Sequence, residues 1–302
     1  MSMMRLTLTQ QMERSGFQAR TVSVDHLEDL RKDIETLRES MDPLFYEEYI
    51  PAFHFELPRS MPDAQSLIVL ARPQPSLMVT LRHDGQMWPL TIPPTYADAS
   101  KADEDAVEAL NAALSPQTYR FIKARLPLKA LAARSGLAKY GRNNITYIPR
   151  FGSFHRLTAF YSDLPCTEDQ WQDPEVLPGC EGCYACMRGC PTGAIPEDRF
   201  LVRAERCLTY MNEKDTSVPF PSWVDPQAHN ALVGCMRCQR LCPYNKAALD
   251  FVAARGELSE EETALLLSGK REGESAFALD EKLRGMGLDP ALFPRNLEVL
   301  LR

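Results

Sequence analysis

The sequence lacks cysteine over its first half and has no long hydrophobic run. No cysteine precedes Cys166 in the 302 residues. The first residues, MSMMRLTLTQQMERSG, have no apolar core of a signal peptide. No later stretch approaches the roughly 18 apolar residues that a membrane span needs. We therefore expect a cytoplasmic protein with no membrane contact, whose thiols stay reduced and form no disulfide framework.

Acidic residues are missing from one stretch. Between Ser115 and Ser162 there are six Arg and three Lys but no Asp or Glu, whereas the whole chain carries a formal charge of −7. The stretch is therefore +9 and the rest of the chain −16. A local positive field in an acidic protein suits an anionic ligand, such as a phosphate-bearing cofactor or nucleic acid. A solvated basic face would have the same composition.

Cysteine is abundant only later in the chain, in two related motifs. The first is Cys180-x2-Cys183-x2-Cys186-x3-Cys190-Pro191, and the second is a lone Cys207 followed by Cys235-x2-Cys238-x3-Cys242-Pro243. In a compact run of this kind three thiolates bind one iron–sulfur cluster and the fourth binds the other. We therefore assign Cys180, Cys183, Cys186 and Cys242 to one [4Fe-4S] cluster, and Cys190, Cys207, Cys235 and Cys238 to the second.

Zinc is the main alternative occupant, because it also binds pairs of cysteines spaced by two. A zinc site does not require a third thiol at x2 and a fourth at x3 followed by proline, so the repeated spacing favours iron. Cys166 is the one cysteine outside the assignment. We expect it to be a small buried residue and not a reactive thiol.

Two clusters occupy only about 60 residues, so the length implies one or two further units. We expect an α+β protein in three parts: an α/β domain over residues 1–165, a ferredoxin-like two-cluster domain over 166–248, and a helical segment rich in Leu and Glu over 249–302. Apart from the cysteine motifs we find no internal repeat and no low-complexity segment.

Local patterns predict several elements of the first domain. Leu27, Leu30, Ile34 and Leu37 have the spacing of an amphipathic helix, with a capping box from Asp25 to Glu28 ahead of it. The apolar run 66–71 predicts a buried strand. Residues 76–81 and 86–92 flank an Asp-Gly pair and predict a hairpin. A further helix is expected over about 101–114.

The basic stretch also contains glycines among aromatic residues, in the segments 135–144 and 150–154. Glycine lets the backbone approach a ligand closely, so these segments favour a cofactor-binding loop.

The same residues carry a family resemblance. The segments Leu131–Leu137, Gly141–Asn143 and Phe151–Ser153, together with the upstream segment 57–69 and the two cysteine motifs, resemble the epoxyqueuosine reductase family over about residues 50–248. The resemblance implies a nitroreductase-like fold related to cobalamin-processing proteins. It further implies a cobalamin that receives electrons from the clusters. By this resemblance the corrinoid would be lined by Gly136, Gly141, Arg142, Asn143, Gly152 and Ser153.

The chain departs from the family at several of these positions. Arg142 replaces the lysine common in the family, and Ala138-Lys139 replaces a Gly-Trp pair. The family's proton-donating aspartate would fall on Ile122, fourteen residues before Gly136, and its neighbour is Lys123. Isoleucine cannot donate a proton. The departures favour a paralogue that acts on a substrate other than epoxyqueuosine.

We therefore expect a cobalamin-dependent oxidoreductase that receives electrons from an external donor such as ferredoxin or flavodoxin and reduces a small molecule or modified nucleoside. The alternatives are an electron-transfer or binding protein without its own chemistry, and an epoxyqueuosine reductase acting on tRNA. The catalytic candidates are Tyr140 and Lys123, with Tyr147 and Arg142 in the same stretch. A cation beside a tyrosine could lower its pKa. For His155 we expect a surface or hydrogen-bonding role in preference to contact with the corrinoid.

Overall fold

The chain forms two units whose sequences interleave. The computed structural model describes residues 7–198, 200–270, 272–288 and 293–301. Unit 1 comprises residues 1–73 and 100–183, and unit 2 comprises residues 74–99 and 184–302. The β-hairpin expected within the first domain therefore belongs to the same unit as the C-terminal segment. The division expected at 165/166 and 248/249 stays a prediction.

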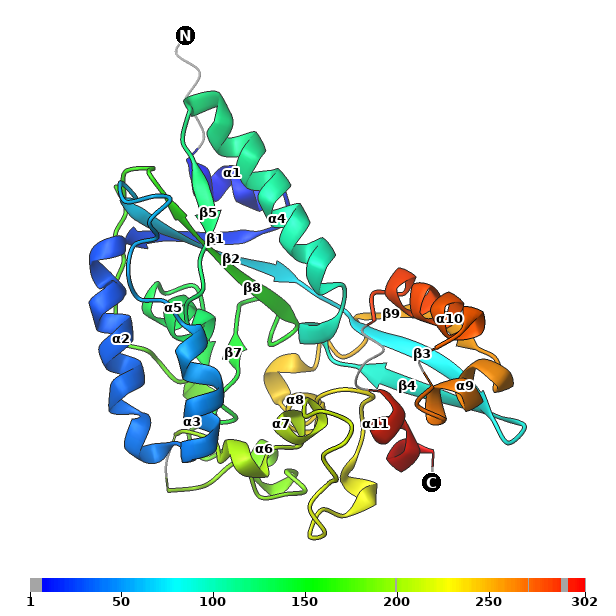
Figure 1. Cartoon of the computed structure of the whole chain (residues 1–302). Coiled ribbons are helices and arrows are strands. Elements are labelled where there is room, and N and C mark those ends of the chain that lie inside the picture. Colours follow the sequence, from blue (N-terminus) through cyan, green and yellow to red (C-terminus); the bar gives the residue numbers. More distant parts are fainter. Residues whose placement is uncertain (1–6, 199, 271, 289–292, 302) are drawn as a thin grey trace. The chain divides into compact units, whose positions relative to one another are not determined.

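Unit 1 is built on a four-stranded antiparallel sheet (Figure 1). The strand order is β1 (Gln18–Ser23), β2 (Ser66–Pro73), β8 (His155–Ser162), β5 (Phe121–Lys123). Its predicted central strand, the apolar run of β2, is confirmed, with Leu70 opposite both Ala19 and Thr158. A strand buried on both faces reads as a continuous apolar run because neither side alternates with solvent.

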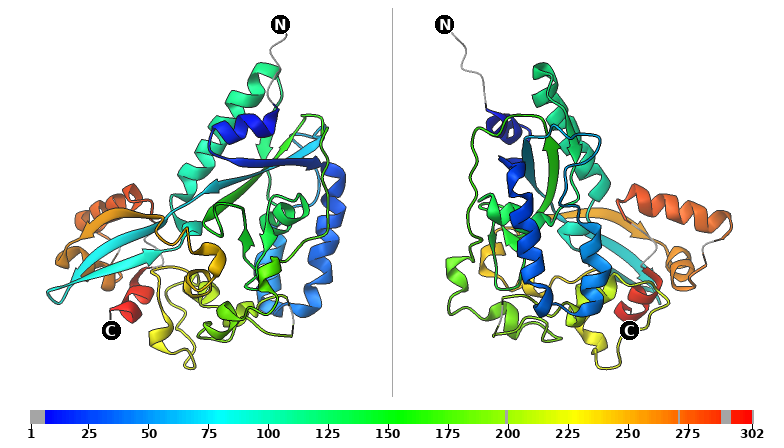
Figure 2. Two further views of the ribbon diagram at one scale, coloured as in Figure 1. Left: turned by 180° about the vertical axis from the view of Figure 1, so that it is seen from behind. Right: turned by 60° about the vertical axis from the view of Figure 1, so that its left-hand side comes forward.

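Helices cover both faces of this sheet (Figure 2). Alternate residues of β2 enter different cores. Leu67 and Val69 pack with α2 (Leu27–Thr36) and α5 (Leu128–Arg134). Ile68 and Leu70 pack with α1 (Leu8–Arg14) and α4 (Ala99–Leu114). The remaining elements of unit 1 are α3 (Pro43–Tyr49), β6 (Lys139–Tyr140) and β7 (Thr146–Tyr147).

The predicted helix α2 is confirmed, with Leu27, Leu30 and Ile34 buried. The predicted capping box is wrong. His26 is the N-cap of α2 and makes no side-chain capping bond, while Ser23 caps the preceding 3-10 turn, Val24–His26. The capping side chain is therefore Ser23, two residues before the predicted Asp25, because a short 3-10 turn precedes the helix.

Unit 2 is built on a three-stranded sheet of order β4 (Gln86–Ile92), β3 (Ser76–His83), β9 (Val252–Leu258). The β3–β4 hairpin is confirmed. Its turn residues Asp84 and Gly85 have φ of 51° and 70°, as a two-residue hairpin turn with positive φ requires. Leu77, Val79 and Leu81 of β3 are buried in one cluster with the helices that follow β9.

The C-terminal segment is not wholly helical. The helices α9 (Glu260–Leu267), α10 (Glu274–Gly285) and α11 (Phe293–Leu300) are as expected, but β9 is a strand that pairs in parallel with β3. The helical prediction is wrong for β9 because the pairing partner lies far away in the sequence, where composition gives no signal for it.

The cysteine-rich part of unit 2 consists of loops and three short helices: α6 (Ala185–Arg188), α7 (Leu208–Asn212) and α8 (Arg237–Arg240). The buried Asn296 of α11 fixes these loops by donating to the carbonyls of Asn212 and Leu232, at 3.0 and 3.1 Å. Throughout the part of the chain that the structure describes, the helices are too short or too polar to cross a membrane.

Candidate metal centre and the segment leading to it

Three cysteines assigned to the second cluster lie close together in unit 2. Burial raises the pKa of the Cys207 thiol, and the neighbouring Cys235 raises it further. Burial also raises the pKa of Cys235, and Cys190 adds to this rise. The fourth cysteine of the first motif is thus a neighbour of the second motif. This convergence, from three separate segments, fits a cluster held by crossed ligands.

Neutral donors point at two of these sulfurs. The Ala194 amide donates to Cys190 Sγ at 3.3 Å, and the Thr192 hydroxyl lies 3.6 Å from the same atom. Asn230 Nδ2 donates to Cys235 Sγ at 3.2 Å, while its Oδ1 accepts from the Met236 amide at 2.8 Å. Hydrogen bonds to sulfur are a principal means by which a protein tunes an iron–sulfur cluster.

The ends of the two motifs pack directly on each other within unit 2. A Cβ built at Gly189 would lie 2.0 Å from Leu241 Cδ1 and 3.2 Å from the Ala185 carbonyl. Gly189 precedes Cys190, and Leu241 precedes Cys242. Glycine at position 189 lets the Leu241 side chain pack against the backbone beside Cys190, and a larger residue there would displace Leu241.

The first two cysteines of the first motif, Cys180 and Cys183, lie at the C-terminal end of unit 1. The Cys180 amide donates to the Leu177 carbonyl at 2.9 Å, and the Cys183 amide donates to the Cys180 carbonyl at 3.3 Å. We call residues 169–180, which lead to this point, the tether.

The tether is paired with β6 along its second half. Tyr140 and Val176 form a parallel bridge, in which the Tyr140 amide donates to Glu175 O at 2.8 Å and the Leu177 amide donates to Tyr140 O at 2.7 Å. Two residues beyond Tyr140, the Arg142 amide donates to Cys180 Sγ at 3.4 Å and its guanidinium to Cys180 O at 3.2 Å. The bridge register thereby brings Arg142 against the first cluster cysteine.

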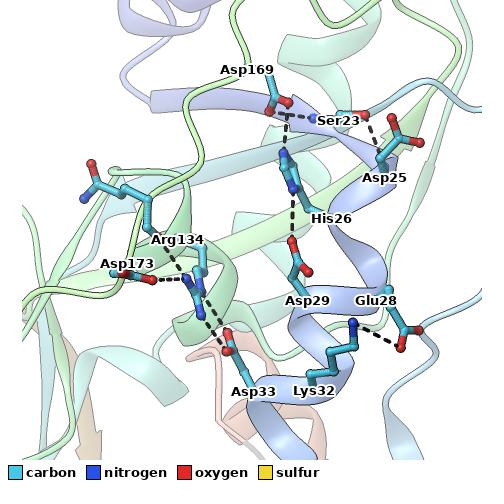
Figure 3. A network of polar contacts seen from close by, with 11 residues as sticks. Ser23, Asp25, His26, Glu28, Asp29, Lys32, Asp33, Arg134, Asp169 and Asp173 are labelled. Atoms are coloured by element: carbon cyan, nitrogen blue, oxygen red, sulfur yellow. Dashed lines mark hydrogen bonds and ion pairs between the residues drawn. The ribbon is translucent and has the colours of Figure 1, made fainter.

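Helix α2 and helix α5 hold the first half of the tether (Figure 3). The ring nitrogens of His26 lie 2.9 Å from Asp169 Oδ2 and 3.3 Å from Asp29 Oδ2. The same ring stacks on Trp171 at a centroid distance of 4.2 Å. Polar contacts of Asp169 and an aromatic contact of Trp171 thus attach the tether to the rest of unit 1.

Arg134 joins three segments in the same network (Figure 3). It donates to both carboxylate oxygens of Asp33, at 2.6 and 2.9 Å, and to Asp173 at 2.7 Å. Its guanidinium also lies over the Trp171 ring. The hydrogen bonds that Arg134 donates to Asp33 raise the pKa of Arg134, against the effect of burial. A two-oxygen pairing of this kind fixes both position and orientation.

Most cations of the basic stretch are neutralised by acids from outside it. Five of them form ion pairs: Arg120 with Asp63 and Asp163, Lys123 and Arg156 with Asp103, Arg134 with Asp33 and Asp173, and Lys139 with Glu175. Burial raises the pKa of Asp103, but hydrogen bonds from Arg156 and Lys123 outweigh this and lower it. These pairs weaken the local positive field that the composition indicated, because the sequence does not reveal which distant acids fold against the stretch.

The glycines predicted to face the corrinoid have neighbours in their own chain. A Cβ at Gly141 would lie 2.5 Å from Tyr147 Cε2 and 2.6 Å from Asn143 Oδ1. A Cβ at Gly136, where φ is 70°, would lie 3.3 Å from Gln172 Oε1. Packing within unit 1 thus accounts for both glycines.

The other predicted cofactor residues lie in the same turns. Asn143 is buried and donates to the Tyr147 hydroxyl at 2.9 Å. Gly152 has φ of 58° and exchanges backbone hydrogen bonds with Ile148, both 2.9 Å long. Ser153 beside it is buried. The structure brings these residues into turns that join β6, β7 and β8. Their contact with a corrinoid stays a prediction.

The proposed acids are not activated in the way the sequence suggested. Burial raises the pKa of Tyr140, and the charge of Asp33 adds to the rise. The expected lowering by a neighbouring cation is therefore wrong for Tyr140, which is a weaker acid in the fold than in water. Lys123 lies on β5 and is paired with Asp103.

Ile122 lies in a strand. It is opposite Tyr161 in the β5–β8 pair and packs against the core shared by α2 and α5. Burial raises the pKa of Tyr161 to about 12. The position that would carry the family's aspartate therefore holds an apolar residue in apolar surroundings.

Of the two roles expected for His155, the hydrogen-bonding role is confirmed and the surface position is wrong, because the side chain is buried. Its ring nitrogens lie 3.1 Å from Thr146 Oγ1 and 3.1 Å from the Gly152 carbonyl. Burial lowers its pKa to about 4, so the ring is neutral near pH 7. His155 thus fixes the Gly152 turn to β7.

Two further features of the described residues involve none of the cysteines assigned to the clusters. A cavity of 380 Å³ in unit 1 is lined in part by Arg20, Tyr119 and Glu168, but by none of the predicted site residues. At the tip of the β3–β4 hairpin, ligand atoms of His83, Asp84 and Glu260 lie within 4.8 Å of one another. Because Asp84 and Glu260 are exposed, we assign no metal to this group.

Sequence reasoning missed the residues that contact the sulfurs. Asn230 and Thr192 belong to no motif, and Arg142 was assigned to the cofactor loop. Thr192 could have been found from its position two residues after Cys190. Asn230 could not have been found in this way, because its spacing of five residues before Cys235 belongs to no known ligand motif.

Residues 179–245 match the family model described as a 4Fe-4S double cluster binding domain. The epoxyqueuosine reductase of Escherichia coli is 36% identical over 119 residues, which are 39% of this chain and 30% of that protein. The enzyme of Pseudomonas aeruginosa is 30% identical over 148 residues, 48% of this chain and 39% of that protein. The matched region thus spans well under half the length of these curated relatives.

Solved structures of epoxyqueuosine reductases have the same fold. The structure from Streptococcus thermophilus aligns with a TM-score of 0.68 and 17% identity, covering 97% of this chain and 80% of that chain. The structure from Bacillus subtilis aligns with a TM-score of 0.64 and 19% identity, covering 96% and 80%. The resemblance recognised from the motifs is confirmed as a similarity: the chain is similar to epoxyqueuosine reductases over part of its sequence and in its fold, and residues 179–245 match a 4Fe-4S double cluster binding domain.

Proposed function

We propose that this chain is an iron–sulfur reductase in which two [4Fe-4S] clusters pass single electrons to a cobalamin that reduces a substrate. The observation that carries the proposal is the convergence of Cys190, Cys207 and Cys235 inside the segment that matches the double-cluster model. Thiols gathered from three segments and met by N–H donors fit a cluster, which binds thiolates and accepts hydrogen bonds at sulfur.

The proposed ligand sets are those given by the spacing. The first cluster takes Cys180, Cys183, Cys186 and Cys242, and the second takes Cys190, Cys207, Cys235 and Cys238. Burial raises the pKa of Cys207 and Cys235, so iron must displace their protons when a cluster forms. Bound clusters supply one-electron transfer, and the chain's own residues position the sulfurs.

The cobalamin and the nitroreductase-like character of unit 1 rest on the family resemblance. The turns at Gly136, Gly141 and Gly152 fit the cofactor only in part, since side chains of unit 1 already occupy the space beside the first two. A bound cobalamin would supply reductive chemistry at cobalt, and we derive no step through it. The role proposed for unit 1 is to bind the cofactor and to exclude water from it.

Anaerobic absorption spectroscopy of the purified protein with hydroxocobalamin tests this function. Two clusters predict about eight iron atoms per chain and a broad thiolate-to-iron band, and a bound corrinoid predicts a shift in its own bands. Zinc at two per chain without a visible band would remove the clusters from the proposal. Full iron with no corrinoid change would leave an electron-transfer protein that passes electrons between partners, such as a ferredoxin or flavodoxin and an acceptor.

Reduction of epoxyqueuosine in tRNA is the second candidate. A solved epoxyqueuosine reductase in complex with an epoxyqueuosine-modified tRNA stem loop aligns with this chain at a TM-score of 0.56 and 22% identity. Against this candidate, Ile122 offers no proton, and loss of a general acid costs about two to four orders of magnitude in rate. Turnover of epoxyqueuosine-containing tRNA at the rate of an E. coli type enzyme would make this candidate the better one.

A further inference from the structure

The sulfurs of the two proposed clusters meet different donors. Cys190 and Cys235 receive hydrogen bonds from a backbone amide and a neutral side-chain amide. Cys180 receives the amide of Arg142, whose guanidinium lies on the carbonyl of the same cysteine at 3.2 Å. A positive charge is therefore held beside one ligand of the first cluster.

The position of Arg142 is imposed by the fold. Gly141, which precedes it, donates to Ile145 O at 2.8 Å, and the Asn144 amide donates back to Gly141 O at 2.9 Å. The parallel bridge of Tyr140 with Val176 fixes the register of this turn against the tether. Arg142 is half-buried, so its charge is less screened than that of an exposed arginine.

We propose that Arg142 is a positioning residue that raises the reduction potential of the cluster ligated by Cys180. Reduction adds one electron to this cluster, from a low-potential one-electron donor, and breaks no bond. The added negative charge is stabilised by a nearby cation, so the cation favours the reduced form. The proposal rests on the clusters of the proposed function and is independent of cobalamin and substrate.

The test is a redox titration of the full chain with dithionite, followed by electron paramagnetic resonance. Arg142→Gln removes the charge but leaves the backbone N–H donor to Cys180 in place. Arg142→Lys restores the charge without the planar fork. Arg150→Gln, at an exposed position of the same stretch, removes one charge away from the cysteines and is the matched control. Cys207→Ala assigns the signals, because the surviving signal belongs to the first cluster.

We expect Arg142→Gln to lower the reduction equilibrium constant of the first cluster about tenfold, which is about 59 mV for a one-electron couple. Arg142→Lys recovers part of this shift, and the second cluster is unchanged. An equal shift in Arg150→Gln, or no shift in Arg142→Gln with iron intact, overturns the proposal and leaves the clusters standing. Absence of iron in the wild-type protein overturns the proposed function itself.

Discussion

Cys180 and Cys235 are held by two parts of the molecule in different ways. Cys180 ends a tether fixed by ion pairs, an aromatic stack and a parallel bridge, and a cation lies on its carbonyl. Cys235 lies in loops fixed by neutral side chains, with Asn230 bonded to both its sulfur and the following amide. The guanidinium of Arg142 donates to the carbonyl of Cys180, whereas the Cys235 sulfur accepts from a neutral side chain, and the charge of Arg237 acts on it only as a minor influence that lowers its pKa.

The difference indicates that the clusters are not interchangeable. Charge and hydrogen bonds near sulfur set the potential of a cluster. A higher potential at the first cluster would favour transfer of an electron from the second cluster to the first. The basic stretch then serves mainly to hold unit 1 together, because its cations are mostly paired, and Arg142 alone contacts a cluster cysteine among the described contacts of that stretch.

Removal of the Cys207 thiol is the strongest test of whether the two clusters are held independently. Because Cys207 replaces the missing first member of the second motif, Cys207→Ala should abolish the second cluster and lower iron from about eight to about four atoms per chain. The iron content and the visible absorption at matched protein concentration measure this loss. Cys166→Ala is the control and should keep all the iron. Loss of all iron in Cys207→Ala, in a folded protein, would contradict independent ligand sets.

Substitution of Arg134 tests whether its ion pairs with Asp33 and Asp173 stabilise the tether. Arg134→Ala leaves the carboxylate of Asp33 without its two-oxygen partner, and both side chains are largely buried, with 17% and 26% exposed. We expect a loss of about 2 kcal/mol in the free energy of unfolding. Urea denaturation under anaerobic conditions measures it.

Lys139→Ala is the matched control for that variant, since it breaks an exposed tether pair with Glu175 and should cost less than about 0.5 kcal/mol. Chelator-driven iron loss adds a second measurement. In Arg134→Ala the iron held through Cys180 should leave faster, while the rest is unaffected. Equal acceleration of all the iron would show that the tether does not serve one cluster in particular.

Local sequence patterns predicted the elements that carry a clear signal in their own residues. The β3–β4 hairpin, the β2 strand and α2 followed from a turn signal, an apolar run and helical spacing. Strand β9 could not be predicted, because its stability comes from pairing with β3 over a long sequence separation. The interleaving of the two units could not be predicted for the same reason, since it depends on the pairing of β3 with the distant β9.

The candidate site was predicted to the extent that chemistry fixes spacing. Four thiolates and a proline at set intervals specify cluster ligands, so the cysteines could be assigned without a fold. The acidic partners of the cations in the basic stretch could not be predicted. Asp33, Asp103 and Glu175 are distant from these cations in sequence or outside any motif. The raised pKa of Tyr140 also depends on burial, which a local sequence pattern does not report.

Substitution of Asn230 should give the smallest effect, a change in the reduction potential of the second cluster alone. Asn230→Asp keeps an oxygen to accept from the Met236 amide, but it loses the N–H donor to Cys235 Sγ and adds a negative charge there. A negative charge disfavours the reduced cluster, so we expect the reduction equilibrium constant of the second cluster to fall about three- to tenfold, roughly 30 to 59 mV. Redox titration measures the fall, and Asn111→Asp, on the exposed face of α4, adds the same charge as a control. The first cluster should keep its potential. If it shifts as far as the second, the two neighbourhoods do not act separately and the comparison fails.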